Sequence, residues 1–204
     1  MIDIFLKVIN NVWPMIFIFT VILVSIRLTY LIYNKQKIVI YKEILTFCFI
    51  LYILFLYYIV TFQDNNYGTN NFIPFKEIFR YEITSTLFLK NVVGNILLFV
   101  PLGLFMTYYI KNKSFIITLI LTIFISCTIE FAQYVIGRTA DIDDIILNSA
   151  GGLLGYIIYS KWNKIIERLP KFLKNQVFLD IVTIIIIIAL VFILFKYEFW
   201  RFIS

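Results

Sequence analysis

Long apolar segments separated by short polar ones make up most of the chain. Several approach the roughly 20 apolar residues that a transmembrane helix needs. They are residues 12–33, 43–62, 91–110, 114–136, 144–160 and 177–196. The pattern predicts an all-α, polytopic helical membrane protein with about six transmembrane helices. The first segment is too long for the apolar region of a signal peptide and lacks a small-residue cleavage site after it, so we expect a retained helix.

The 63–90 connection between the second and third segments has a pattern of its own. It begins with the polar stretch QDNNYGTNN and continues as NFIPFKEIFRYEI. In the second part Phe75, Ile78 and Phe79 share one helical face, and charged residues occupy another. This predicts a short amphipathic helix on the membrane surface, with Pro74 in its first turn. A solvated connector is the alternative.

Composition supports a membrane protein and narrows its chemistry. Hydrophobic residues make up 62% of the chain and charged residues 15%, against about 45–50% and about 25% in soluble domains. The absence of histidine excludes His-based nucleophile activation and His-containing zinc sites. Cys48 and Cys127 fall inside apolar runs and are expected to act as small hydrophobic residues. We expect no cofactor, no metal and no nucleic-acid partner.

Basic residues predict the topology. The loops after the first, third and fifth segments are rich in Lys and Arg, which places them in the cytoplasm. These residues are Lys35, Lys37, Lys42, Lys111, Lys113, Lys161, Lys164, Arg168, Lys171 and Lys174. Both termini and the 63–90 and 137–143 loops are then extracytoplasmic, in a multi-pass protein of the cell membrane.

Amides and carboxylates interrupt three predicted helices near their outer ends. Ionisable side chains in a membrane are costly and suggest a functional site. The topology places those of the third, fourth and fifth helices at similar depth in the outer leaflet: Asn91, Asn95, Glu130, Gln133, Asp144 and Asn148. Arg138 and Asp141 lie in the 137–143 loop, with Arg138 at the mouth of the site. The sequence therefore predicts a polar ligand-binding pocket.

Three functions are compatible with these residues. The first is a non-catalytic site in which Arg138 binds the phosphate or carboxylate head of an amphiphile. The second is an enzyme with Glu130 as general base and the three aspartates 141, 143 and 144 holding Mg²⁺ or Ca²⁺, although no nucleophile motif accompanies them. The third is a structural network that only sets helix packing. Asp143 is expected to be solvated, and Asp144 could cap the fifth helix.

Small residues and prolines indicate how the helices pack. Gly151 and Gly155 form a small-xxx-small pair, and Gly94 is expected to let a neighbouring helix approach. Pro101 in mid-helix predicts a kink, with Gly103 giving room there.

Taken in order, several of these pieces resemble the VanZ-like family of membrane proteins. The matching pieces are Asn71-x-x-Pro74-Phe75, Asn91-x-x-Gly94-Asn95, Phe99-x-Pro101-x-Gly103, Glu130-x-x-Gln133 and Arg138-x-x-Asp141-x-x-Asp144-x-x-x-Asn148-x-x-Gly151-x-x-x-Gly155. The resemblance divides the chain into a first helix and loop (1–42), a VanZ-like four-helix core (43–160), and a basic loop with a last helix (161–204).

The resemblance implies a role in the cell envelope. The family's founding member is linked to low-level resistance to teicoplanin, a lipoglycopeptide. The expected partners are membrane lipids, and the expected ligand is an amphiphilic lipid, a lipid-linked cell-wall precursor or the lipoglycopeptide. Catalysis on a lipid-linked substrate stays the alternative.

Overall fold

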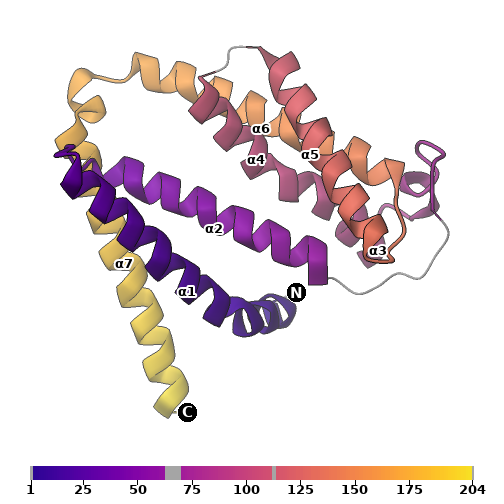
Figure 1. Ribbon diagram of the computed structural model, residues 1–204, viewed down its shortest axis with the longest axis horizontal. Helices are drawn as coiled ribbons and strands as arrows, with labels where there is room; N and C mark the ends of the chain where they lie inside the picture. Colours follow the sequence, from indigo (N-terminus) through magenta and orange to yellow (C-terminus); the bar gives the residue numbers. More distant parts are fainter. Residues whose placement is uncertain (1, 63–69, 112–113, 204) are drawn as a thin grey trace. The chain divides into compact units, whose positions relative to one another are not determined.

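The computed structural model describes residues 2–62, 70–111 and 114–203, almost all of them helical (Figure 1). The long helices are α1 (Ile2–Tyr33), α2 (Ile40–Phe62), α4 (Gly94–Ile110), α5 (Phe115–Val135), α6 (Ile142–Arg168) and α7 (Gln176–Ile203). The short α3 (Thr86–Phe88) and the π-helix η2 (Leu89–Val93) lead directly into α4. The described residues form no strand, only one isolated bridge. The all-α membrane fold is confirmed.

Five helical stretches are long and apolar enough to cross a membrane, judged over the described residues: Trp13–Tyr33, Ile40–Ile59, Thr86–Ile110, Phe115–Val135 and Gln176–Ile193. The predicted span 144–160 lies within α6, which is not among them. Asn148, Ser149 and the glycines of α6 lower its apolar content. A sixth crossing therefore stays a prediction. The polar loop predicted from residue 161 also begins later, because α6 continues to Arg168.

The chain divides into two compact units, Tyr52–Glu167 and a second unit of Met1–Leu51 with Arg168–Ser204. Polar contacts join the helices of the second unit. Arg27 of α1 forms a two-pronged ion pair with Glu43, its Nε and Nη2 donating at 2.8 and 2.9 Å. Asp180 of α7 accepts the backbone N–H of Tyr41 at 2.9 Å, near the start of α2. Both contacts involve residues in the first turn of α2, Tyr41 and Glu43.

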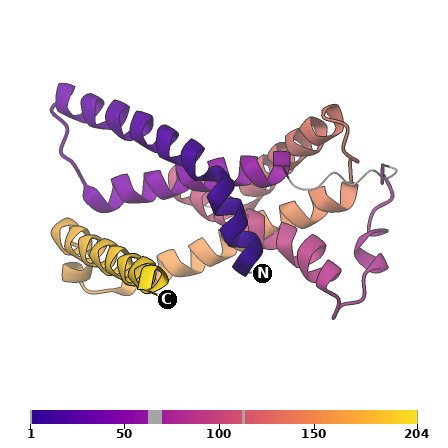
Figure 2. The same cartoon turned by 90° about the horizontal axis from the view of Figure 1, so that it is seen from below.

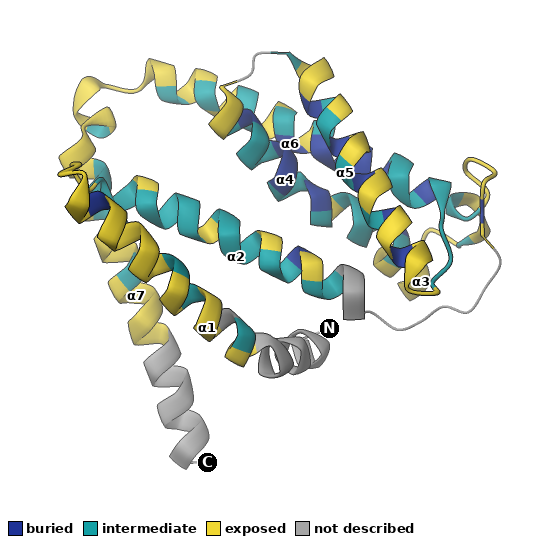
Figure 3. Ribbon diagram, in the orientation of Figure 1, coloured by how far each residue is buried: buried dark blue, intermediate teal, exposed yellow. Residues whose placement is uncertain are grey.

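Within the Tyr52–Glu167 unit, α4, α5 and α6 lie side by side, and most buried residues gather on them (Figures 1 and 3). Glycines let the backbones touch. A Cβ on Gly151 would lie 2.2 Å from the Ile96 carbonyl oxygen, and one on Gly155 would lie 2.1 Å from that of Val100. No side chain fits at such distances, so these glycines set the spacing between α6 and α4.

Gly103 and Gly94, both on α4, have different surroundings. A Cβ on Gly103 of α4 would lie 2.0 Å from the Gly152 carbonyl oxygen of α6, so the two helices meet there. At Gly94 the nearest atom would be the Leu89 carbonyl oxygen of its own segment, at 3.6 Å. The expectation that Gly94 admits a neighbouring helix is therefore wrong.

A buried polar stripe runs along α5. Its members recur every three or four residues and are all at most 8% exposed: Thr118, Thr122, Ser126, Glu130 and Gln133. The hydroxyl of Thr122 donates to the Thr118 carbonyl at 2.9 Å, which satisfies it within the helix. Ser126 instead accepts from the side chain of Asn148 on α6 at 2.9 Å. The stripe ends at the polar cluster described below.

The segment between residues 70 and 85 is a chain of turns, not the predicted amphipathic helix (the magenta stretch leading into α3 in Figure 2). Its one helical piece is a 3-10 turn of three residues, Ile78–Arg80. Phe75 has a φ of 66°, a left-handed conformation that an aromatic residue rarely adopts. Pro74 precedes this residue and does not start a helix. The early part of the 63–90 connection, 63–69, lies outside the described residues.

Candidate functional site

The site is built where the 70–78 segment meets the start of α6. Asn71 and Asp141 form a parallel bridge. The Asn71 N–H donates to the Ala140 carbonyl at 2.9 Å, and the Ile142 N–H donates to the Asn71 carbonyl at 3.0 Å. The amide of Asn71 also donates to Asp141 Oδ1 at 2.8 Å. Main-chain and side-chain hydrogen bonds thus hold the 70–78 segment against the start of α6.

Asp141 caps α6. Its Oδ1 accepts the N–H of Asp143, the second residue of the helix, at 2.9 Å, which is the usual geometry of an N-cap. The alternative that Asp144 caps this helix is therefore wrong. Asp144 lies inside the first turn, and its Oδ1 accepts from the Asn95 amide of α4 at 2.5 Å. Burial raises the pKa of Asp141, and the donors Asp143 N–H and Asn71 oppose that shift.

Asp143 anchors the 70–78 segment. Its side chain is 1% exposed. It accepts the backbone N–H groups of Phe75, Glu77 and Ile78 at 2.5, 2.7 and 3.2 Å. The expectation that Asp143 is solvated is wrong, because the carboxylate replaces water with N–H donors from the connection. The left-handed backbone of Phe75, with its φ of 66°, is what interrupts a regular helix there.

Glu130 joins α5 to the same junction. Its carboxylate is 5% exposed, and Oε2 accepts the Asp141 N–H at 2.9 Å. Gln133, with its amide oriented to satisfy both neighbours, donates to Glu130 Oε1 and accepts from Arg138 Nη1, each at 3.2 Å. Arg138 reaches the cluster through this amide. The cluster is rich in acids. The negative charges of Glu130, Asp141 and Asp143 all act on Asp144, and the positive charge of Arg138 opposes them.

Two predicted site residues lie apart from this cluster. Asn91 donates to the Tyr81 hydroxyl at 3.0 Å, so it supports the end of the 70–85 segment. Asn148 lies one turn deeper than Asp144 on α6 and binds Ser126. Its Oδ1 is buried without a hydrogen-bond partner in the part of the chain that the structure describes. The predicted convergence of three helices thus splits into an acidic layer at the start of α6 and an amide–hydroxyl layer one turn further along it.

The three aspartates do not share a ligand position. Asp141 binds Asn71, Asp143 binds the backbone of the 75–78 turn, and Asp144 binds Asn95. Among the described residues no three His, Cys, Asp or Glu side chains come together as metal ligands do. The geometry gives no support to the alternative in which these aspartates hold Mg²⁺ or Ca²⁺.

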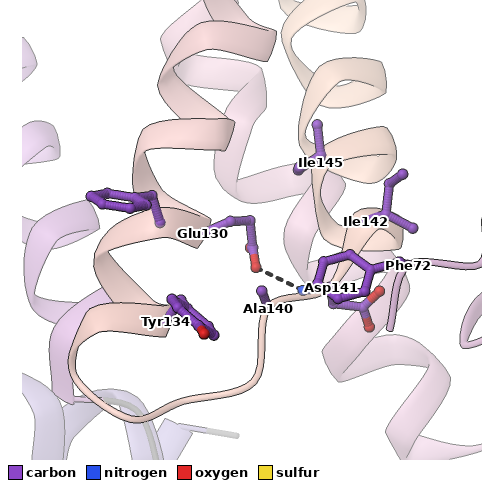
Figure 4. A pocket seen from close by; sticks show the side chains of 8 residues that line it. Phe72, Glu130, Tyr134, Ala140, Asp141, Ile142 and Ile145 are labelled. Carbon is purple, nitrogen blue, oxygen red and sulfur yellow. Dashed lines mark hydrogen bonds between the residues drawn. The ribbon is translucent and has the colours of Figure 1, made fainter. Parts of the chain in front are cut away.

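A pocket of about 300 Å³ opens beside the Glu130–Asp141 contact (Figure 4). This is the lower end of the usual size for a small-molecule site. It is lined by Phe72, Glu130, Phe131, Tyr134, Ala140, Asp141, Ile142 and Ile145. Most of the lining is apolar or aromatic, and its charged groups are both carboxylates. Arg138, expected at the mouth, is not among the lining residues.

The sequence alone did not assign some residues to the site. Phe72 lies beyond the bridge residue Asn71 and reaches the pocket only because the segment folds back. Asn71 carries no functional signal in the sequence beyond its place in the family resemblance. The α5 stripe had a local signal, since Thr118, Thr122, Ser126 and Glu130 recur at intervals of four in an apolar helix.

Comparisons with known proteins show the family of the chain. The family model described as VanZ/LLP1 matches residues 44–166. Protein VanZ of Enterococcus faecium is 29% identical over 108 residues, which cover 52% of this chain and 66% of that relative, just under two thirds of its length. No solved structure matches the chain with significance. Because the family model spans more than half of the sequence and contains the whole junction of Asn71, Glu130 and Asp141, the chain belongs to the VanZ/LLP1 family.

Proposed function

We propose that this protein binds an amphiphile at the Glu130–Asp141 pocket and so contributes to resistance of the cell envelope to glycopeptides of the teicoplanin type. The ligand is a membrane lipid, a lipid-linked cell-wall precursor or the lipoglycopeptide itself. The observation that carries the proposal is the pocket's lining. Aromatic and aliphatic walls meet two carboxylates within the part of the chain that the family model matches.

The pocket favours holding a ligand over transforming it. Both Glu130 oxygens already accept hydrogen bonds, one from Asp141 N–H and one from Gln133. A general base needs hydrogen-bond reach to a substrate proton, and Glu130 is 5% exposed. The apolar walls would instead bury an acyl or prenyl chain, which gains free energy with each methylene removed from water.

Two phenylalanines on α5 provide a matched test. Phe131 lines the pocket and is 68% exposed, whereas Phe124 lies two turns away, is 69% exposed and does not line it. With a photoreactive alkyl lipid as probe, Phe131→Ala should lower labelling near the α5–α6 turn at least about tenfold, because burying an aromatic side chain contributes about 1.5–3 kcal/mol and about 1.4 kcal/mol is a factor of ten. Phe124→Ala should leave labelling unchanged.

The resistance part is tested in a teicoplanin-susceptible bacterium that expresses the full chain. Phe131→Ala should lower the inhibitory concentration of teicoplanin at an unchanged protein level, and Phe124→Ala should not. A Glu130→Gln variant that keeps labelling but loses resistance would instead favour the enzyme. Parallel loss of resistance and protein level in Glu130→Gln would favour a purely structural network.

A further inference from the structure

The 72–83 segment carries an apolar surface although it belongs to no candidate membrane span. Five of its large apolar side chains are between 49% and 83% exposed: Phe72, Ile73, Phe75, Phe79 and Ile83. The rings of Phe75 and Phe79 lie together, with centroids 6.3 Å apart. Exposed apolar surface of this kind marks a site of interaction with a membrane or a protein.

Both ends of the segment are held at helices that can cross a membrane. The chain continues from it into Thr86–Ile110, a candidate span (Figure 2). At the other end Phe72 lines the pocket built on the last two turns of α5, whose Phe115–Val135 stretch is another candidate span. A short connection joins α4 to α5, so the two spans cross in opposite directions. The segment therefore begins and ends at the same membrane surface.

The backbone of the segment needs little water. From Ile73 to Arg80 every backbone N–H donates to an atom of the protein, and Pro74 has none to donate. Asp143 accepts three of these N–H groups, the Asn71 side chain accepts one, and carbonyls of the segment accept the others. Backbone polar groups that leave water must find partners within the protein. The donors of these turns meet that condition without forming a helix.

Charge does not select the partner of this surface. Lys76 and Arg80 are offset by Glu77 and Glu82, which leaves the segment without net charge. Arg80 also pairs with Glu77 at 3.1 Å. Anionic headgroups attract clusters of Lys and Arg, and this segment has no excess of either sign. The burial of apolar side chains is left as the driving force.

We propose that the apolar surface of the 72–83 segment inserts into the bilayer at the boundary between headgroups and acyl chains, as a chain of turns. Side chains such as Phe79 enter this boundary, and the backbone stays bonded to α6. Phe72 belongs both to this surface and to the pocket wall, so a bilayer amphiphile reaches the pocket without crossing water. That consequence rests on the proposed function, whereas the insertion itself does not.

Spin-label accessibility tests the insertion. In the full chain with Cys48→Ala and Cys127→Ala, nitroxides are attached through Phe79→Cys, at an 83% exposed apolar position, and through Glu82→Cys, at an exposed polar position of the same segment. The protein is reconstituted without ligand in phosphatidylcholine vesicles. Oxygen concentrates in lipid and a nickel chelate stays in water. The ratio of oxygen to nickel collision rates should be severalfold higher at residue 79 than at residue 82.

A second apolar position and a second lipid extend the test. A label at Ile83, which is 77% exposed and directly follows the control residue, should give a ratio like that of residue 79. Phosphatidylglycerol vesicles should give the same ratios as phosphatidylcholine, because the segment has no net charge. Insertion seen only with phosphatidylglycerol would mean electrostatic attraction to the headgroups, and would overturn the proposal.

The remaining outcomes are equally decisive. Equal ratios at residues 79 and 82 would mean that the segment is a solvated connector, which contradicts the insertion. Low collision rates with both reagents at residue 79 would mean that a second copy of the chain covers the surface, and this also contradicts it. Neither result bears on amphiphile binding, because the vesicles hold no ligand. That function is judged by the lipid labelling of the Phe131→Ala protein.

Discussion

Asp143 attaches the 70–78 segment to α6 through a single carboxylate. Three backbone N–H groups donate to it, and it is 1% exposed. Hydrogen bonds to a charged group contribute about 1.5–3 kcal/mol each, and buried donors left without a partner cost a similar amount. The residue therefore positions Phe72 at the pocket without lining it.

Substitutions of Asp143 should rank by how many acceptors they keep. Asp143→Asn keeps one oxygen and should lower the free energy of unfolding by about 1.5–3 kcal/mol, and Asp143→Ala should lower it further because all the N–H donors lose their partner. Thermal unfolding in neutral detergent measures this order. Glu82→Gln should unfold like the wild type. Wild-type stability in Asp143→Ala would show that the segment is held by other contacts.

Helix α6 combines close packing with polar contacts. Its glycines face α4 at Ile96 and Val100 and face α5 at Thr122. The atoms that an added Cβ would meet are backbone atoms at one glycine and side-chain atoms at another. A Cβ on Gly155 would meet backbone, at 2.1 Å from the Val100 oxygen, whereas one on Gly152 would meet a side chain, at 2.2 Å from Thr122 Cγ2. Backbone cannot be trimmed by mutation, but a methyl group can.

This difference predicts a selective rescue. Gly152→Ala and Gly155→Ala should each destabilise the protein by about 1–3 kcal/mol through overpacking. Adding Thr122→Ser removes Cγ2 and should recover part of the Gly152→Ala loss, but none of the Gly155→Ala loss. Gly94→Ala, where the nearest atom is 3.6 Å away, should be tolerated. Unfolding temperatures of the purified variants decide it, and equal rescue of both substitutions would refute the packing described.

For the protein as a whole, the orientation of α6 decides the topology. We expect the 63–90 and 137–143 loops outside the cell and the basic residues after α6 inside, which requires α6 to cross the membrane. Its apolar content is lower than that of the five candidate spans. Polar side chains that pair with α4 and α5, as Asn148 does with Ser126, reduce the cost of such a crossing.

Cysteine accessibility tests this orientation. In a chain with Cys48→Ala and Cys127→Ala, a membrane-impermeant maleimide on intact cells should label Thr84→Cys and not Lys171→Cys. Both should react after lysis. Three crossings, through α4, α5 and α6, would separate the two positions, so labelling of both on intact cells would mean that α6 does not span.

The positions of the helices follow from the sequence because the length of an apolar run is a local property that the membrane thickness selects. The polar residues of α5 and α6 and the family resemblance also follow from the order of residues along the chain. The resemblance is confirmed by the family model. These features need no knowledge of which helices touch.

The partners of the polar groups depend on folding. The position of Asp143 in a short loop predicts a solvated side chain. The N–H groups that donate to its carboxylate nevertheless come from residues 65 to 68 positions earlier in the chain. Turns replace the predicted amphipathic helix, because Phe75 adopts a left-handed φ of 66° that interrupts a helical backbone. Likewise Asn91 binds Tyr81 and Arg138 lies off the pocket. A carboxylate's hydrogen bonds are decided by distant segments, and so is the lining of the pocket beside Glu130 and Asp141.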